Sequence, residues 1–125
     1  MKYFFDNCLS PKYAAMLKGL GVDVVHLQDE LPANTADPVL LRHIAGKDLV
    51  FVSGDRRMLA MFLSELKAAN VMALFLGKYW KRIKLWDGAV WFVSRWPTMT
   101  KFAEGATRGT LAEVKQNGKC EPLHL

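Results

Sequence analysis

The chain has 125 residues, a formal net charge of +5, and a composition of 51% hydrophobic and 23% charged residues. This length fits one domain with a sizeable core, and no apolar run approaches the roughly 18 residues of a membrane span. Two cysteines, Cys8 and Cys120, are too few for a disulfide framework, and Asp6 interrupts any secretory signal. We therefore expect a cytoplasmic protein with free thiols, a disulfide between the two cysteines being the alternative.

The charge is unevenly distributed along the chain. Residues 1–62 contain seven Lys or Arg and seven Asp or Glu, whereas residues 63–125 contain ten and five. The first half has as many acids as bases, and the second half has twice as many bases as acids. This division predicts an acidic functional site in the first half and a surface for a polyanion in the second. Ordinary solubility would explain the same basicity equally well.

Apolar runs alternate with amphipathic stretches as far as residue 77, and Gly, Asn, Ser-Pro and Asp-Pro separate them. The expected elements are a strand at 2–6, a helix at 11–20, a strand at 22–27, a loop at 28–36, a helix at 37–45, a strand at 49–53, a helix at 58–69 and a strand at 71–76. Strands that alternate with helices predict an α/β fold with a mainly parallel sheet, here of four to five strands.

The pattern changes after residue 77. We expect a basic, aromatic helical segment at 78–104, with its helix at about 85–95, and then a strand or hairpin tail at 105–125. Asn117-Gly118 between two alternating stretches predicts a hairpin. The tryptophans of the basic segment either contact RNA or, more commonly, fill the core or a partner interface. They are Trp80, Trp86, Trp91 and Trp96.

Three aspartates stand where elements of such a sheet meet. Asp6 follows the first strand, Asp55 follows the third, and Asp37 opens the helix that leads into the third. Because parallel strands present their carboxyl ends at one edge, we expect the three acids near one another there. Their mutual repulsion calls for a cation, and carboxylate oxygens suit Mg²⁺ or Mn²⁺. Such an ion can activate water and neutralise a phosphodiester during cleavage.

Two of these acids also have simpler explanations. Asp37 precedes a proline and would then be only the N-cap of its helix. Asp55 lies in a polar turn and could simply be solvated. Asp6 follows two phenylalanines directly, where packing alone does not explain a carboxylate.

These motifs, in this order, resemble PIN-like domains, the fold of many VapC-like toxin ribonucleases. The resemblance is greatest to a small variant that opens with Asp-Glu-Asn-Leu-Ser-Pro, and it covers roughly residues 2–77. The matching stretches are 5–11 (Phe-Asp-Asn-Cys-Leu-Ser-Pro), 24–29 (Val-Val-His-Leu-Gln-Asp), 36–40 (Ala-Asp-Pro-Val-Leu) and 50–55 (Val-Phe-Val-Ser-Gly-Asp).

The resemblance implies a three-layer α/β/α fold and a metal-dependent ribonuclease. By this resemblance Asp6, Asp37 and Asp55 bind the Mg²⁺ or Mn²⁺, and Asp29 (or Glu30) is a weaker fourth acid. The candidate substrate-binding residues are Ser53, which would support the acids, and the basic residues Arg56, Arg57, Lys81 and Arg82. The implied partners are RNA, a cognate antitoxin and a second copy in a homodimer, with no membrane.

The chain departs from that variant at two positions. Asn7 stands where the variant has Glu, and Arg57 stands where it often has a second acid. These departures leave open a PIN-like module that binds RNA or protein without catalysis. Arg56 and Arg57 either contact RNA phosphates or only make the start of a helix soluble. A phosphatase of the Asp-x-Asp type would need an acid at position 8, which is Cys8, and no histidine lies near that thiol in the sequence to make it a nucleophile.

Overall fold

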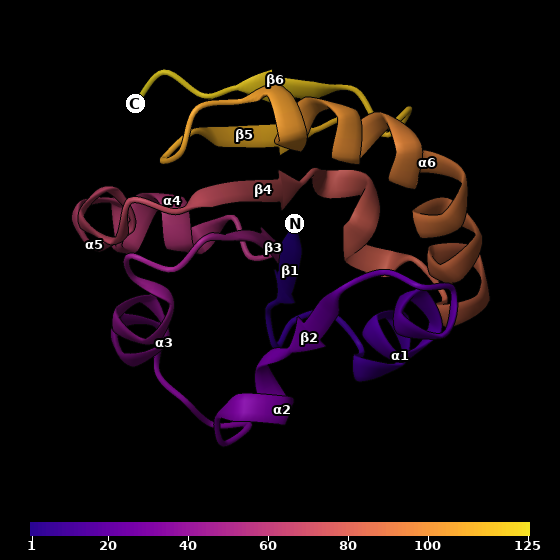
Figure 1. Cartoon of the computed structure of the whole chain (residues 1–125), viewed down its shortest axis with the longest axis horizontal. Coiled ribbons are helices and arrows are strands. Elements are labelled where there is room, and N and C mark those ends of the chain that lie inside the picture. The colour runs from indigo at the N-terminus through magenta and orange to yellow at the C-terminus, as the bar shows by residue number, and fades with distance from the viewer.

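The computed structural model describes residues 1–125, which form one six-stranded sheet with helices on both sides (Figure 1). The strands are β1 (Lys2–Phe5), β2 (Val24–His26), β3 (Leu49–Ser53), β4 (Met72–Leu76), β5 (Leu111–Val114) and β6 (Cys120–Pro122). The helices are α1 (Pro11–Gly19), α2 (Leu27–Glu30), α3 (Asp37–Ile44), α4 (Arg57–Met61), α5 (Leu63–Ala69) and α6 (Leu85–Gly105), with a 3₁₀ helix, η1 (Lys78–Arg82).

The strand order is β2-β1-β3-β4-β5-β6, and only the last pair is antiparallel. The predicted α/β class and the mainly parallel sheet are therefore confirmed. The predicted count of four to five strands is wrong, because β5 pairs in parallel with β4 and carries the hairpin partner β6 into the same sheet. The hairpin itself turns at Asn117-Gly118, as expected, and Gly118 has a φ of +88°.

The inner strands β1, β3 and β4 bury both of their faces. Phe5 and Val52 lie in a core completed by α1 and α6, whereas Phe4 and Phe51 lie in a second core completed by α3, α4 and α5. Neighbouring side chains of a strand point to opposite faces, so each strand serves both cores. This explains why the strands read as continuous apolar runs rather than as alternating patterns.

Two helical boundaries differ from the expectation in the first half of the chain. The expected loop at 28–36 begins with helix α2, because the His26 ring caps Gln28 while Asp29 bonds back to the His26 backbone. The expected helix at 58–69 is two helices that meet at Phe62, whose φ is −131°. This break lets Met58 of α4 and Leu66 of α5 reach the same core.

Helix α6 extends ten residues beyond Arg95, where the helix was expected to end, and it continues through Pro97. Met99 and Ala103 extend its buried face beyond the proline, so core packing outweighs the lost backbone hydrogen bond. Near its start, Gly88 lies against Tyr13 of α1, where an added Cβ would overlap the tyrosine hydroxyl. The two helices can approach closely only because this position carries no side chain.

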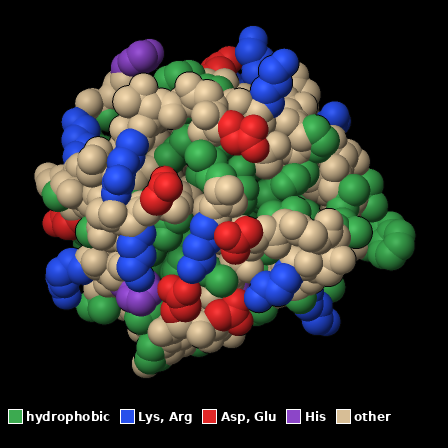
Figure 2. Space-filling view, in the orientation of Figure 1, with side chains coloured by type: hydrophobic (Ala, Val, Ile, Leu, Met, Phe, Trp, Pro, Cys, Tyr) green, Lys and Arg blue, Asp and Glu red, His purple; other side chains and the backbone are tan.

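Three of the four tryptophans pack inside the protein. Trp80 and Trp91 are buried, with ring centroids 5.4 Å apart, and Trp96 is partly buried with its ring 4.7 Å from that of Tyr3. Trp86 is 78% exposed, and Figure 2 shows hydrophobic side chains on the right edge of the molecule, on the α6 side. No helix, α6 included, has the length and apolarity needed to cross a membrane.

Candidate active site

A buried serine joins two of the predicted acids at the carboxyl edge of the sheet. Because Phe5 pairs with Val52, the residues that follow on β1 and β3, Asp6 and Ser53, lie side by side. The Ser53 hydroxyl donates to Asp6 Oδ2 at 2.7 Å and accepts the Asp55 backbone N–H at 3.0 Å. One fully buried hydroxyl therefore fixes both acids relative to each other.

Asp6 is only 5% exposed, which is unusual for a carboxylate. Burial raises its pKa, the hydrogen bonds from Ser53 and the Asn7 backbone oppose that rise, and the charge of Asp55 adds to it, so that the pKa lies above its usual range. The Asn7 N–H donates to Asp6 Oδ1 at 2.7 Å, so both oxygens are oriented. This carboxylate carries a charge that a nearby cation would stabilise.

Asp37 belongs to the same electrostatic cluster, and the interpretation of it as an N-cap is wrong. The N-cap of α3 is Ala36, Asp37 is the first helical residue, and no side chain caps this helix. Partial burial raises the pKa of Asp37 first, and the charges of Asp6 and Asp55 raise it further. Capping therefore does not explain this aspartate, and the charges of two other carboxylates, Asp6 and Asp55, act on it at this edge.

The donor set suits a hard divalent cation, although no three Asp, Glu, His or Cys side chains converge closely enough to enclose one. Mg²⁺ does not require an enclosing cage, since it usually binds one or two carboxylates and keeps several waters. Asp6 and Asp55, joined through Ser53, are compatible in chemistry with such an open site. Asp37 adds a third negative charge nearby.

Neither candidate for a fourth acid joins this cluster. Asp29 Oδ2 accepts the His26 backbone N–H at 2.8 Å within the cap of α2. Glu30 pairs with His43 at 2.8 Å and Lys2 at 3.4 Å, and the hydrogen bond from His43 is the main reason that its pKa is lowered. Both acids stabilise local structure.

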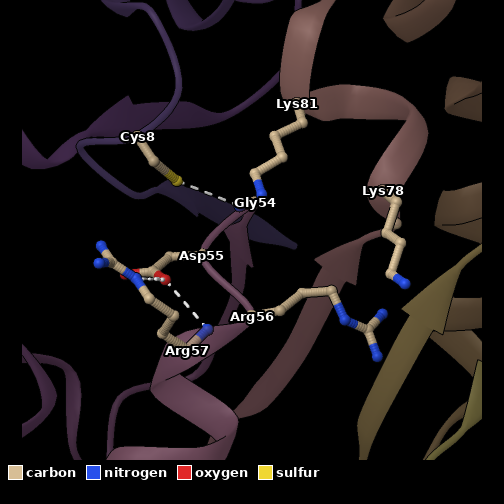
Figure 3. Close-up of a pocket in the computed structure, with 8 residues that line it drawn as sticks. Cys8, Gly54, Asp55, Arg56, Arg57, Lys78 and Lys81 are labelled. Carbon is tan, nitrogen blue, oxygen red and sulfur yellow. Dashed lines mark hydrogen bonds and ion pairs between the residues drawn. The ribbon is translucent and has the colours of Figure 1, made fainter.

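A basic cleft of about 510 Å³ opens beside Asp55 (Figure 3). It is lined by Cys8, Gly54, Asp55, Arg56, Arg57, Gly77, Lys78 and Lys81. Four of these eight residues are basic and one is acidic, so the cleft favours an anion. Figure 3 shows the Lys81 side chain reaching from η1 toward Gly54, while Lys78 and Arg56 extend from opposite sides toward the same region.

The two arginines of the cleft differ in what holds them. Arg56 pairs with Glu113 of β5 at 2.8 Å, and Lys115 pairs with the same carboxylate at 3.2 Å. Arg57 donates to Asp55 Oδ1 through its backbone N–H at 3.0 Å and its Nε at 3.3 Å. The structure thus brings Arg56, Arg57 and Lys81 to the cleft, whereas Arg82 is exposed and does not line it.

Sequence reasoning missed Glu113 as a neighbour of the site, whereas Lys78 was part of the basic segment expected to face RNA. Lys78 directly follows the end of β4 and belongs to the basic run, a signal that was available. Glu113 lies opposite Phe75, which itself lies opposite Ser53. Only the pairing of β5 with β4 shows this, because nothing in the local sequence marks Glu113.

Cys8 and Asn7 complete the surroundings of Asp6. The Cys8 sulfur accepts the Gly54 N–H at 3.1 Å and lies 3.7 Å from Asp6 Oδ2. Burial, followed by the charge of Asp6, raises the pKa of Cys8 to about 11, so the thiol is protonated at neutral pH and is a poor nucleophile. The Asn7 side chain turns away from Asp6 and bonds to Ala33 O and Gln28 Nε2.

The chain matches the family model of the PIN-like domain over residues 1–77, which is more than half of its length. It therefore belongs to the PIN-like domain family, whose members are commonly nucleases. The matched part includes the three aspartates, Ser53 and both arginines of the cleft, whereas Lys78, Lys81 and Glu113 lie outside it. No curated protein and no solved structure matches the chain.

Proposed function

We propose that the protein is a metal-dependent endoribonuclease that hydrolyses RNA phosphodiesters with Mg²⁺ or Mn²⁺. Asp6 and Asp55 would hold the ion at the carboxyl edge of the sheet, and Asp37 would add a third negative charge nearby. The observation that carries the proposal is the Ser53 hydroxyl that joins two acids beside a cleft with four basic side chains. A third acid, Asp37, lies near enough that the charges of the other two add to the effect of burial in raising its pKa.

In this proposal some residues bind the metal ion, others position those ligands, and others bind the RNA backbone. Ser53 fixes the carboxylates of Asp6 and the backbone of Asp55, so the acids keep one arrangement as the substrate arrives. The basic side chains attract the RNA backbone, and Glu113 orients the Arg56 guanidinium toward the cleft. A bound divalent ion would supply an activated water and neutralise charge on the phosphodiester.

The proposal extends to the biological role of a toxin in a type II toxin–antitoxin system. Its support is the resemblance of the opening motif, Phe5 to Pro11, to the small PIN-like variant, together with the family match. In this role a cognate antitoxin holds the enzyme inactive in the cytoplasm, and two copies can pair. Expression of the wild-type chain alone would then arrest growth, and Asp6→Asn would relieve the arrest.

RNA cleavage by the purified chain tests the enzymatic proposal. We expect cleavage with Mn²⁺, none with EDTA, and a loss of at least about 100-fold in the rate for Asp6→Asn, because removal of even an outer partner of a metal site costs 10–100-fold. Asp48→Asn is the matched control, since Asp48 is exposed at the opposite end of β3. Cleavage that survives Asp6→Asn or EDTA would refute the assignment.

A PIN-like module that binds RNA without cutting it is the second candidate. Two observations favour it: Arg57 already pairs with the Asp55 carboxylate, and Asn7 contacts a loop where the variant has an acid. This candidate predicts equal RNA affinity in EDTA and in Mn²⁺, no cleavage in either, and no effect of Asp55→Asn on binding.

A further inference from the structure

A second cavity, of about 400 Å³, adjoins the basic cleft. The two cavities share Cys8, Gly54 and Lys81, so they are neighbouring parts of one surface. The second cavity is lined by Cys8, Ser10, Tyr13, Gly54, Trp80, Lys81, Ile83 and Leu85. The proposed cleavage reaction uses none of its aromatic or aliphatic residues.

The second cavity differs from the cleft in chemistry. Five of its eight lining residues are hydrophobic, and it has neither an arginine nor an acid. The rings of Tyr13 and Trp80 meet edge to face at 5.4 Å within the core, which makes this wall rigid. Ile83 and Leu85 are less buried and form a wall nearer to the solvent. Cavities of this size that combine aromatic and aliphatic side chains with polar groups suit small organic ligands.

Gly54 and Lys81 line both cavities and lie at the boundary between them. A Cβ at Gly54 would lie 3.1 Å from Trp80 Cδ1, so the backbone next to Asp55 runs directly along the indole. Lys81 lines both cavities, and Figure 3 shows its ammonium group near Gly54. A ligand that spans this boundary therefore meets four basic side chains on one side, and aromatic and aliphatic side chains with polar groups among them on the other.

A nucleotide unit of RNA has this division of chemistry, because it joins an anionic phosphate to a flat base with an apolar face. We propose that the second cavity, bounded by Tyr13, Trp80, Ile83 and Leu85, binds one unpaired nucleobase of single-stranded RNA whose phosphate lies in the basic cleft. The inference rests on the proposed function for its substrate class. A base within a duplex is stacked and paired and cannot enter, so the cavity selects single-stranded RNA.

Binding of labelled RNA, followed by fluorescence anisotropy in EDTA, tests this proposal without any cleavage. The probes are an unstructured oligonucleotide, the same strand in a perfect duplex, and the same strand with every base removed. We expect the wild-type chain to bind the unstructured strand at least about fivefold more tightly than the other two, which corresponds to the lower limit measured for one base–aromatic contact.

Two variants change the cavity without removing a buried core residue. Leu85→Ser and Ile83→Ser each remove part of the wall nearer to the solvent, and Leu20→Ser is the control because Leu20 is an exposed leucine outside both cavities. We expect each cavity variant to bind the unstructured strand about fivefold or more weakly, with unchanged binding of the base-free strand. Leu20→Ser should behave as the wild type.

The outcomes separate this proposal from the nuclease proposal. Equal affinity of the wild-type chain for the three probes, or unchanged affinity in both cavity variants, would overturn the base site even if Mn²⁺-dependent cleavage were present. Base-dependent binding that both variants abolish would support it even if no cleavage were detected, and would then leave the binding module as the function of the chain.

Discussion

At the scale of single residues, the site depends on how Asp6 and Asp55 are held rather than on the acids alone. A buried carboxylate without partners would be neutral or strongly destabilising. The Ser53 hydroxyl and the Asn7 N–H supply partners for both oxygens of Asp6. The serine two residues before Asp55 thus belongs to the site as much as the acids do, although it is fully buried and cannot touch a substrate.

Ser53→Ala removes a donor from Asp6 and an acceptor from the Asp55 N–H in one change. We expect a loss of about 1–3 kcal/mol in the free energy of unfolding, since buried polar groups are left without partners. Urea denaturation measures this, with Ser64→Ala as control because Ser64 is exposed on α5 and should differ little. Equal stability of Ser53→Ala and wild type would contradict the assigned hydrogen bonds.

Asp37 provides a test of the electrostatic cluster. Its pKa in the folded protein is raised by partial burial and by Asp6 and Asp55, so the folded state binds a proton there more tightly than the unfolded state does. The free energy of unfolding therefore falls as the pH rises from the usual aspartate range through the raised pKa. In EDTA, Asp37→Asn should show a smaller fall in Tm over that pH window than the wild type.

The same thermal scans of Asp48→Asn provide the control, because that exposed residue lies outside the acid cluster. A pH dependence of Tm that is identical in Asp37→Asn and wild type would show that neither burial nor the neighbouring carboxylates raise the pKa of Asp37 in the folded protein. A larger fall in the variant would have the wrong sign and would exclude the cluster as described.

At the scale of elements, the contact between α1 and α6 closes one face of the sheet. Gly88 permits it, since a Cβ there would overlap the Tyr13 hydroxyl. Tyr13 in turn contacts Trp80, which walls the proposed base cavity. The approach of two helices therefore shapes a surface next to the site.

Gly88→Ala should destabilise the protein by about 1–3 kcal/mol, the usual cost of inserting a methyl group into a packed interior. Gly105→Ala in the same helix is the matched control, because nothing lies within 4 Å of a Cβ at that position. It should leave stability unchanged or raise it by up to about 1 kcal/mol through helix propensity. Chemical denaturation measures the free energy of unfolding of both variants. A Gly88→Ala protein as stable as the wild type would contradict the close packing of Gly88 against Tyr13.

The sequence predicts the strands of this fold better than its helices. Residues 49–53 form a strand with the predicted bounds, since a short apolar run buried on both faces has few alternatives. Helix ends depended on tertiary contacts: Met99 and Ala103 carry α6 past Pro97, and a histidine ring caps α2. Residue propensities and hydrophobic periodicity describe neither the core contacts of α6 nor the side-chain cap of α2, so they could not predict these helix ends.

The candidate site was predictable to the extent that topology determines it. Asp6 and Asp55 follow neighbouring parallel strands, so their adjacency follows from the βαβ order. Asp29 was predicted to be a fourth acid of the site. Its carboxylate instead caps α2, and the sequence had suggested a loop there. Glu113 is far from Arg56 in the sequence, and only the pairing of β4 with β5 joins them.

At the scale of the whole molecule, residues beyond the family match complete the fold. Helix α6 contributes Trp91, Phe92 and Met99 to the core on one face of the sheet, and β5 covers the edge of β4. Basic residues of the cleft also come from both parts of the chain, Arg56 from the matched part and Lys81 from the rest. The two parts therefore form one structural unit with a shared cleft.

A fragment of residues 1–77 should not fold by itself, because it would expose the apolar face that α6 covers and leave β4 as an open edge. We expect it to aggregate or to lack dispersed amide signals in an NMR spectrum, whereas the full chain gives a dispersed spectrum. Cooperative unfolding of the soluble fragment would contradict the view that the C-terminal part is integral to the domain.

Binding of Mn²⁺, measured by isothermal titration calorimetry, tests the central claim most directly, because the claim is that Asp6 and Asp55, with the charge of Asp37 nearby, bind a divalent ion at the edge of the sheet. The account predicts a saturable Mn²⁺ isotherm for the wild type and for Asp48→Asn, and an affinity at least about tenfold lower for Asp55→Asn. Absence of Mn²⁺ binding in the folded wild-type chain, or equal binding by Asp55→Asn, would contradict it.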